Sequence, residues 1–299
     1  MKNNFKKFLT LGLAGIMAVG LTACGGNESS SSKTSSGSSS NNTSSTSSED
    51  NASSTDKLSG KLTINGSTSM EKVVKALNEA FIAKNSDVSI DLIASGSGTG
   101  IKQAQEGRAD IGTSSRKLKD SETGLTATNI AVDGVAIIAN KEVGVEDITL
   151  EQLGQIYNGE IKNWKDLGGA DSNIVVIGRE EGSGTRGAFE DIVTGGEAAK
   201  AYAQTLDSTG AVINAVSTTP GAIGYASLAN VDDTVLSLKI DGVEATDETI
   251  KDGSFKVQRP FVFAIKEGND SELIQAYVDF VLSDEGQEIV QAQGLTKVK

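Results

Sequence analysis

The sequence predicts an α/β protein in which strands alternate with helices around mainly parallel sheets. A β-branched run predicts a strand at 61–66, and the segment 69–85 after it predicts a helix. In that helix Val73, Leu77 and Phe81 recur at the spacing of a single helix face. Repetition of this strand-helix unit along the chain favours α/β architecture over separate helical and sheet regions.

Later segments continue the alternation. Runs of apolar and β-branched residues predict strands at 87–95, 109–115, 128–140, 173–178, 227–240 and 255–266. Helical spacing of apolar residues predicts helices at 98–107, 150–159, 184–193 and 271–294. Because ligands of such proteins bind beyond the carboxyl ends of the strands, the strand-to-helix junctions are where a site is expected.

The composition excludes several classes of protein. The 299 residues include no His and one Cys, so they offer no His-dependent nucleophile, no His-ligated metal and no internal disulfide. We therefore expect no metal and no cofactor. Lys and Arg total 27 against 40 Asp and Glu, a net charge of −13, and a nucleic-acid partner would need a basic surface instead.

The N-terminus has the pattern of a secretory signal. Three Lys among the first seven residues precede an apolar run at 8–21, which is too short to span a bilayer comfortably. Residues 21–24, Leu-Thr-Ala-Cys, resemble the lipobox of bacterial lipoproteins. This resemblance implies a signal peptide at 1–23, a net charge of −16 after its removal, and a membrane anchor of fatty acyl chains such as palmitate on Cys24. The alternative is an ordinary signal peptide in which Cys24 has no role.

A Ser-rich, low-complexity segment follows and extends to about residue 57. It contains almost no residue that could fill a core, so we expect a disordered tether at 24–57 and a globular part from residue 58 onward. Within the globular part, GSGTG at 96–100 and GSGTR at 182–186 each follow a predicted strand. The repeat suggests two similar lobes that face one ligand, although chance similarity in a Gly-rich chain is the alternative.

Small residues and hydroxyls gather at four predicted strand-to-helix junctions. The four segments are 66–69, 96–100, 112–116 and 182–186. The free N–H groups of a helix start favour anions, Gly lets an anion approach the backbone, and Ser and Thr add neutral donors. Together the four favour an oxyanion site, although any one alone is as well explained as a helix cap. Thr68 and Glu71, for example, have the spacing of a capping box.

Arg179 precedes the fourth of these segments. A guanidinium binds an oxyanion through two parallel hydrogen bonds, and a nearby carboxylate could hold it in place. The alternative is a surface ion pair of little energetic weight. Patterns that suggest enzymes are weaker. The spacing G-x-G-x-x-G at 182–187 follows two Glu that would repel a pyrophosphate, and the S-x-x-K spacings at Ser69 and Ser114 lack their companion motifs. We therefore expect a binding protein and no catalytic residues.

The motifs together resemble the PstS family, the phosphate-binding lipoproteins of bacterial ABC importers. They follow the family's order through the globular part: NGSTSM, SGSGTGIKQ, ADIGTSSRKL, AVDGVAIIAN, YNGEIKNWKDLGG, GREEGSGTRGAFE and PGAIGYASL. The resemblance implies a type II periplasmic-binding-protein fold of two α/β lobes joined by a two-strand hinge. Lobe 1 would comprise 58–133 and 260–299, and lobe 2 would comprise 134–259. The chain would cross between the lobes near 132–134 and 258–261, and closure of this hinge would bury the anion.

The family's phosphate ligands transfer by motif to seven residues: Thr68, Ser69, Ser97, Arg179, Ser183, Gly184 and Thr185. Glu181 occupies the position that orients the Arg. This chain departs from the family at Ser115, followed by Arg116, where some members have an Asp that accepts the proton of phosphate. We include Ser115 in the site with Arg116 in a supporting role. We predict that Asp133 accepts that proton, with Asp110 as the second choice. Such an acceptor would disfavour sulfate, which carries no proton.

The resemblance implies an extracytoplasmic binding lipoprotein that captures inorganic phosphate and delivers it to an ABC permease. We expect a monomer, anchored to the outer face of the cell membrane in a Gram-positive type of envelope. The alternatives are a receptor for sulfate, molybdate or another oxyanion, a secreted phosphoesterase, and an adhesion or signalling protein with the same fold.

Overall fold

The computed structural model describes residues 57–298 of the chain. The predicted signal peptide, Cys24 and nearly all of the predicted tether lie outside the described residues. The described residues belong to one compact unit. Within it, apolar side chains gather in separate cores, and we use the two largest to define lobe 1 and lobe 2.

Lobe 1 combines the first strands and helices with the last two helices of the chain. Its elements are β1 (Ser59–Gly66), α1 (Glu71–Lys84), β2 (Asp87–Ala94), α2 (Ser97–Gln105), β3 (Ile111–Ser114), α7 (Glu272–Leu282) and α8 (Asp284–Ala292). β1 lies between β2 and β3 and is parallel to both. The stripe predicted on α1 is buried, since Val73, Leu77 and Phe81 are all within the lobe 1 core.

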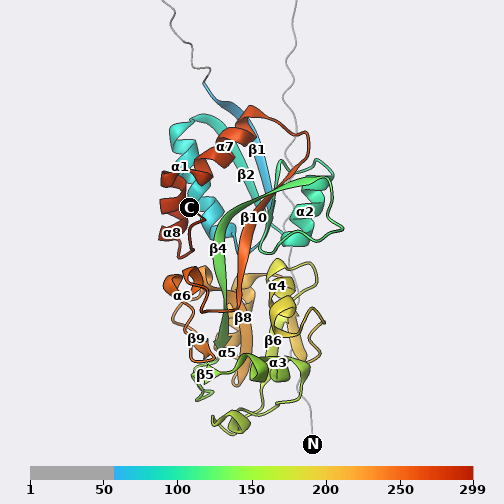
Figure 1. The fold of residues 1–299 in the computed structure, drawn as a ribbon, viewed down its shortest axis with the longest axis vertical. Coiled ribbons are helices and arrows are strands. Elements are labelled where there is room, and N and C mark those ends of the chain that lie inside the picture. The colour runs from blue at the N-terminus through green and yellow to red at the C-terminus, as the bar shows by residue number, and fades with distance from the viewer. Residues whose placement is uncertain (1–56, 299) are drawn as a thin grey trace, which may run out of the picture. The chain divides into compact units, whose positions relative to one another are not determined.

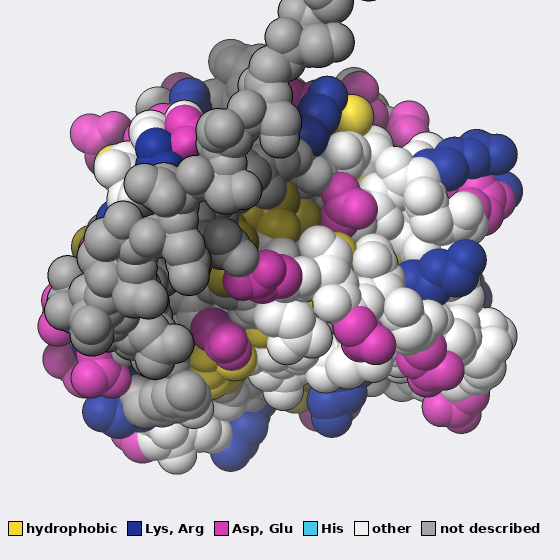
Figure 2. All heavy atoms as spheres, turned by 90° about the horizontal axis from the view of Figure 1, so that it is seen from above, with side chains coloured by type: hydrophobic (Ala, Val, Ile, Leu, Met, Phe, Trp, Pro, Cys, Tyr) yellow, Lys and Arg dark blue, Asp and Glu magenta, His cyan; other side chains and the backbone are white. Residues whose placement is uncertain are grey.

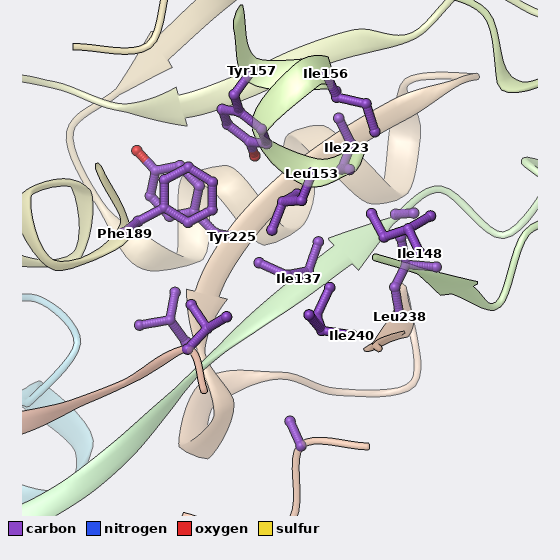
Figure 3. Close-up of a cluster of buried hydrophobic side chains, with 14 of the residues drawn as sticks. Ile137, Ile148, Leu153, Ile156, Tyr157, Phe189, Ile223, Tyr225, Leu238 and Ile240 are labelled. Atoms are coloured by element: carbon purple, nitrogen blue, oxygen red, sulfur yellow. The ribbon is translucent and has the colours of Figure 1, made fainter. Parts of the chain in front are cut away.

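Lobe 2 contains the middle of the chain. Its elements are β5 (Asp147–Ile148), α3 (Leu150–Asn158), η1 (Trp164–Leu167), β6 (Val175–Arg179), α4 (Gly184–Val193), β7 (Tyr202–Leu206), α5 (Thr209–Thr218), β8 (Ala222–Ser227), η2 (Leu228–Asn230), β9 (Leu236–Ile240) and α6 (Asp247–Lys251). Figure 3 shows its core, where the rings of Phe189 and Tyr225 stack with centroids 4.2 Å apart and Tyr157 packs against both. Such offset aromatic packing adds to the stabilisation from buried area.

Two long strands connect the lobes. β4 (Leu125–Ala139) and β10 (Gln258–Lys266) run antiparallel and side by side from one lobe into the other, as Figure 1 shows. Their register places Asp133 opposite Arg259 and Gly134 opposite Gln258. The predicted crossings near 132–134 and 258–261 fall on these two strands, and the lobe boundaries derived from them stay a prediction.

The strands form a mixed α/β arrangement with the order β2-β1-β3-β10-β4-β8-β6-β7, and β9 pairs with both β4 and β5. Parallel pairs lie inside each lobe, whereas every pair that involves β4 or β10 is antiparallel. The expectation of mainly parallel sheets is therefore right for the interior of the lobes and wrong for the connecting strands. Those strands return the chain directly from one lobe to the other without a crossover helix.

Several segments differ from the predicted elements. The elements β5, β7, α5, β8 and α6 were not predicted. β7, for example, is a largely exposed edge strand whose residues show no clear alternation. Of the strand expected at 227–240, only the last part forms a separate strand, β9; η2 and a turn precede it. The C-terminal helix breaks at Ser283, whose hydroxyl accepts a hydrogen bond from the Gly286 N–H and so caps α8.

None of the helices within residues 57–298 is long and apolar enough to span a membrane. On the face that Figure 2 shows, basic and acidic side chains are interspersed, and the visible described atoms form no continuous basic patch. This distribution agrees with the acidic composition.

Candidate functional site

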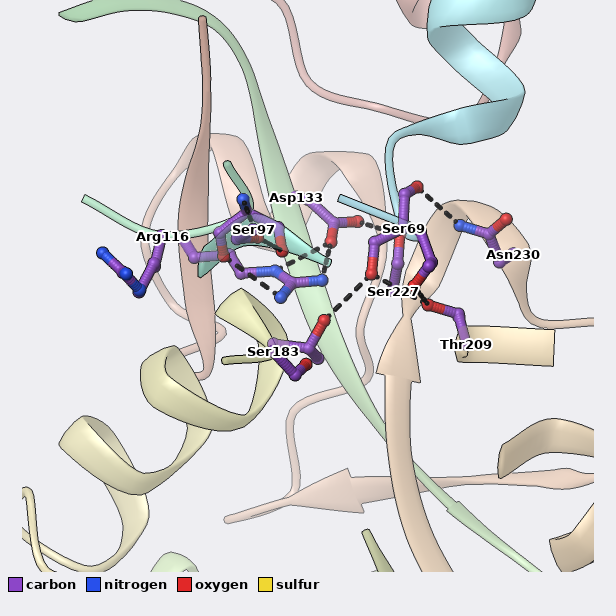
Figure 4. Close-up of polar contacts among 12 residues, drawn as sticks. Ser69, Ser97, Arg116, Asp133, Ser183, Thr209, Ser227 and Asn230 are labelled. Carbon is purple, nitrogen blue, oxygen red and sulfur yellow. Dashed lines mark hydrogen bonds and ion pairs between the residues drawn. The ribbon is translucent and has the colours of Figure 1, made fainter. Parts of the chain in front are cut away.

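Polar residues from both lobes converge where strands end and helices begin. β1, β3 and β6 end at this place, and α2, α4 and α5 start there. We call the group the interlobe cluster, and its members are Thr68, Ser69, Ser97, Ser115, Arg179, Ser183, Gly184, Thr185 and Thr209. All of them except the half-buried Thr68 are buried. Figure 4 shows several of these side chains pointing toward one another from separate elements.

Hydroxyl groups join the lobes within the cluster. Ser69 Oγ of lobe 1 lies 2.9 Å from Thr185 Oγ1 and 3.0 Å from Thr209 Oγ1 of lobe 2. Thr68 Oγ1 lies 3.2 Å from Thr209 Oγ1, and the Asn230 amide donates to the Ser69 carbonyl at 3.0 Å. Because these residues are far apart in sequence and belong to different lobes, the structure describes the lobes closed on each other.

The repeated Gly-Ser-Gly-Thr segments face each other across the lobes. The Gly98 N–H of the first segment donates to the Gly182 carbonyl of the second at 2.9 Å. A Cβ added at Gly184 would overlap Ser97 Oγ and would lie 2.7 Å from Ser115 Oγ. Glycine is therefore required at position 184 in this closed arrangement, because any side chain would separate the two segments.

Thr68 does not cap the helix that follows it. α1 begins at Glu71, its N-cap residue is Met70, and no side chain caps it. The capping-box interpretation of Thr68 and Glu71 is therefore wrong for this structure. The Thr68 hydroxyl contacts Thr209 of the other lobe instead.

Arg179 is the buried cation of the cluster, with 3% of its surface exposed. Its Nε donates to the Leu206 carbonyl at 3.1 Å, its Nη2 to the Asp207 carbonyl at 2.7 Å and its Nη1 to Thr209 Oγ1 at 3.2 Å. All three acceptors are uncharged, and burial lowers the pKa of Arg179 to about 10. Since a guanidinium has five N–H donors, one on Nη1 and one on Nη2 remain for a further acceptor.

Glu181 and Arg116 do not have the supporting roles predicted for them. Glu181 is exposed, and backbone carbonyls hold the Arg179 guanidinium in its place. The Arg116 guanidinium instead forms two hydrogen bonds to the Glu122 carboxylate, at 2.8 and 2.6 Å. The sequence analysis placed Glu181 by motif, and a motif cannot show that the loop turns its side chain toward solvent.

Asp133 and Arg259 form a fully buried ion pair at the hinge. Arg259 donates from Nε and Nη2 to Asp133 Oδ2, at 3.2 and 2.9 Å, and from Nη1 to the Ser115 carbonyl at 3.1 Å. Asp133 Oδ1 accepts from the Ser227 hydroxyl at 2.9 Å, and the Ala229 backbone also donates to the carboxylate. Burial raises the pKa of Asp133 from its ordinary value, against the opposing effect of Arg259.

These four bonds fill the acceptor positions that a carboxylate has. In this conformation Asp133 therefore holds the two connecting strands together. That it accepts a proton from the ligand stays a prediction. The second choice, Asp110, lies just before β3, at the end of that strand remote from Ser115. Its carboxylate accepts from the Thr63 N–H at 2.7 Å.

The sequence analysis did not include Thr209 or Arg259. Ser208, Thr209 and Gly210 form a further junction of hydroxyls and Gly between a strand and a helix, so the signal that identified four other segments was present here. Arg259 is a charged residue in a strand that is otherwise largely apolar. Since a buried charge requires a partner, this position could have been identified from the sequence.

The patterns that suggest an enzyme do not assemble into catalytic groups. Ser69 Oγ contacts Thr185 and Thr209, whereas the Lys72 ammonium donates to the Ala229 carbonyl at 3.2 Å. Ser114 Oγ donates to the Arg116 carbonyl. Within the described part of the chain, no group of three or more acidic or Cys side chains could hold a metal ion.

A groove of about 590 Å³ borders the cluster. Its lining includes Thr68 and Thr209 together with Lys72 and Lys75 of α1. Solvent can therefore reach the edge of the cluster at the hydroxyls that join the lobes.

Comparison with known proteins places this arrangement in a family. Residues 43–285 match the family model of the PBP superfamily domain. The chain is 36% identical to the phosphate-binding protein PstS of Bacillus subtilis, over all of this chain and 95% of that protein. It is 29% identical to the phosphate-binding protein PstS of Borreliella burgdorferi, over 80% of this chain and 90% of that one.

Solved structures agree with these matches. A phosphate ABC transporter substrate-binding protein of Clostridium perfringens, solved with bound phosphate, is 47% identical with a TM-score of 0.78, over 80% of this chain and all of that one. An ABC-type phosphate transport receptor of Vibrio cholerae is 30% identical with a TM-score of 0.67, over 79% and 99% of the two chains. The chain therefore belongs to the PBP superfamily and, within it, to the PstS family of phosphate-binding proteins.

Proposed function

We propose that this protein is the extracytoplasmic substrate-binding component of an ABC importer, which captures inorganic phosphate between its lobes and delivers it to the permease. It is not an enzyme, since its relatives are substrate-binding proteins. The relative from Clostridium perfringens was solved with bound phosphate, and the cluster here offers groups suited to the same anion.

The observation that carries the proposal is that the buried Arg179 forms no salt bridge with a carboxylate of the described residues. A guanidinium 97% removed from solvent is costly unless an anion compensates it, and the three acceptors it contacts are neutral. Its two remaining N–H groups lie on different nitrogens, and this pair fits the two oxygens of a phosphate. Asp133 does not compensate Arg179, because Arg259 already pairs with it.

The interlobe cluster also supplies neutral donors. The hydroxyls of Ser69, Ser97, Ser183 and Thr185 come from both lobes, and α2 and α4 begin at the cluster with free N–H groups. A tetrahedral anion needs donors on all sides, and two closed lobes supply them. The proposed phosphate ligands are Thr68, Ser69, Ser97, Ser115, Arg179, Ser183, Gly184 and Thr185.

Such a site does not require a basic surface. The net charge of −13 argues against a polyanion, whereas a small anion that is enclosed by dipoles and one cation experiences mainly its immediate surroundings. The donors of Arg179 and the hydroxyls can therefore bind phosphate in a protein that is acidic overall.

The proposal extends to the N-terminal segment. Acyl chains on Cys24 would anchor a monomer to the outer face of the cell membrane, and the Ser-rich segment would let it reach the permease. Cells grown with labelled palmitate test this: the wild type should carry label and sediment with membranes, and Cys24→Ala should do neither. Label retained by Cys24→Ala would contradict the anchor.

Calorimetric titration of the chain from residue 58 onward with phosphate, sulfate and molybdate tests the ligand. We expect tight binding of phosphate at pH 7 and at least 100-fold weaker binding for Arg179→Met, since a buried charged contact would be lost. Arg108→Met, at an exposed Arg paired with Glu106, is the matched control and should bind as the wild type does. Tighter binding of sulfate or molybdate than of phosphate would refute the proposed ligand.

A further inference from the structure

Thr209 lies at the centre of the contacts that join the two lobes. It is the first residue of α5 and 3% exposed, and its hydroxyl oxygen has three polar neighbours. Two of these, Thr68 Oγ1 at 3.2 Å and Ser69 Oγ at 3.0 Å, belong to lobe 1. The third is Nη1 of Arg179 in its own lobe, at 3.2 Å. Figure 4 shows Thr209 beside Ser69.

The hydrogen-bonding capacity of a hydroxyl determines how these contacts work. Thr209 Oγ1 has one proton to donate and two lone pairs with which to accept. Nη1 of Arg179 can only donate, so it occupies one lone pair. The remaining lone pair and the proton are available to Thr68 and Ser69, and both are satisfied only while lobe 1 lies against lobe 2.

Thr209 also completes the support of the Arg179 guanidinium. The carbonyls of Leu206 and Asp207 hold Nε and Nη2 from one segment of lobe 2, and Thr209 holds Nη1 from the start of the next helix. With all three nitrogens fixed, the plane of the guanidinium is determined and its two free N–H groups have a set direction.

We propose that Thr209 is a positioning residue of the anion site, which orients Arg179 and makes that orientation depend on closure of the lobes. The inference rests on the proposed function, since the anion it concerns is phosphate. A hydroxyl that lobe 1 fixes after the anion is bound stabilises the closed complex, so its loss should act mainly on the dissociation rate of phosphate.

The test compares two substitutions at this position. Thr209→Val keeps the shape and removes the hydroxyl, whereas Thr209→Ser keeps the hydroxyl and removes a methyl group. We expect Thr209→Val to bind phosphate about 10- to 100-fold more weakly, with most of the change in the dissociation rate measured by stopped flow. Thr209→Ser should remain within about threefold of the wild type. Thr218→Val, at the exposed end of the same helix, should bind like the wild type.

The outcomes separate this inference from the proposed function. If the wild type does not bind phosphate, the proposed function fails. If the wild type binds it and Thr209→Val binds equally well, the inference alone is overturned. It is also overturned if Thr209→Ser is as weak as Thr209→Val, because the methyl group and not the hydroxyl would then matter. Melting of each unliganded variant identifies loss of folding, and Thr209→Ala replaces Thr209→Val if the latter does not fold, with the same expected loss.

Discussion

Arg259 and Asp133 face each other on the two strands that connect the lobes, and two hydrogen bonds of 3.2 and 2.9 Å join their side chains. Arg259 also holds the Ser115 carbonyl, and Asp133 also holds the Ser227 hydroxyl. One buried ion pair therefore connects the hinge, the interlobe cluster of lobe 1 and the end of β8 in lobe 2.

Removal of one partner of this pair should strongly destabilise the protein. Arg259→Met leaves the Asp133 carboxylate buried without its cation, and we expect a loss of about 3–5 kcal/mol in the free energy of unfolding. Urea denaturation followed by circular dichroism measures it. Lys61→Met, which breaks an exposed ion pair with Asp91, should cost at most about 1 kcal/mol. Equal losses in the two variants would show that the buried pair stabilises the protein no more than an exposed ion pair does.

Asp133→Asn distinguishes the hinge role from the role predicted from sequence. Because the acceptor positions of Asp133 are filled by Arg259, Ser227 and Ala229, we expect the ratio of phosphate to sulfate affinity to stay within about threefold of the wild type. The stability of the variant should fall. Calorimetric titration with both anions gives the ratio. A large drop in that ratio would instead support Asp133 as the acceptor of the phosphate proton.

Gly184→Ala should weaken phosphate binding without destabilising the separate lobes. The added Cβ would collide with Ser97 and Ser115 of the other lobe, so the lobes could close only by shifting their segments. We expect at least about tenfold weaker binding, as one collision of this kind costs more than about 1 kcal/mol.

Gly210→Ala serves as the control for that substitution. It also lies in the first turn of a helix at the cluster, but a Cβ there would meet no atom within 4 Å beyond its chain neighbours and its own helix backbone. It should bind phosphate normally, with a small gain in stability from the better helix former. If both variants bind like the wild type, the described closed arrangement is not the one that binds the anion.

The pair formed by Arg116 and Glu122 should make stability depend on pH in the acid range. Burial alone would raise the pKa of Glu122, but hydrogen bonds from Arg116 and from the Lys119 N–H outweigh it and lower the pKa below its ordinary value of 4.5. A carboxyl group with a lowered pKa in the folded state stabilises the protein above 4.5, and this contribution disappears as the pH falls below 4.5 through the folded-state pKa.

Glu122→Gln tests this dependence. At pH 7 we expect the variant to be about 1 kcal/mol less stable than the wild type, since charge-assisted bonds at a partly exposed site are lost. The difference should shrink as the pH is lowered below 4.5, the ordinary pKa of Glu. Denaturation curves across the acid range measure it, and a difference that stays constant with pH would contradict the assignment.

Prediction from the sequence succeeded where local pattern and tertiary structure require the same residues. The buried stripe of α1 at Val73, Leu77 and Phe81 follows from helical spacing alone. The site was predicted at the strand-to-helix junctions because free N–H groups are a property of every helix start. In the structure Ser97 and Thr185 lie in the first turns of α2 and α4, and the hydroxyl of Ser69 contacts that of Thr185.

Prediction was incomplete where a side chain could form either a contact close in sequence or a contact with a distant residue. Thr68 had the spacing of a capping box, yet its hydroxyl contacts Thr209, because closure of the lobes offers a partner that sequence spacing does not include. Glu181 lay two residues from Arg179 in sequence, but the loop exposes it to solvent. Arg259 was missed because its partner is distant in sequence, whereas Thr209 was missed although its junction has the same pattern of Gly and hydroxyls as the four segments that were identified.

The sequence by itself determined the alternation of strands and helices, the concentration of Gly, Ser and Thr at the strand-to-helix junctions and, through the absence of His, the exclusion of much catalytic chemistry. These properties depend on residue type and short-range spacing. Only the tertiary structure decided which charges are compensated. It paired Asp133 with Arg259 and surrounded Arg179 with neutral acceptors, because the partner of a buried charge is set by how distant strands pack and not by its neighbours in the chain.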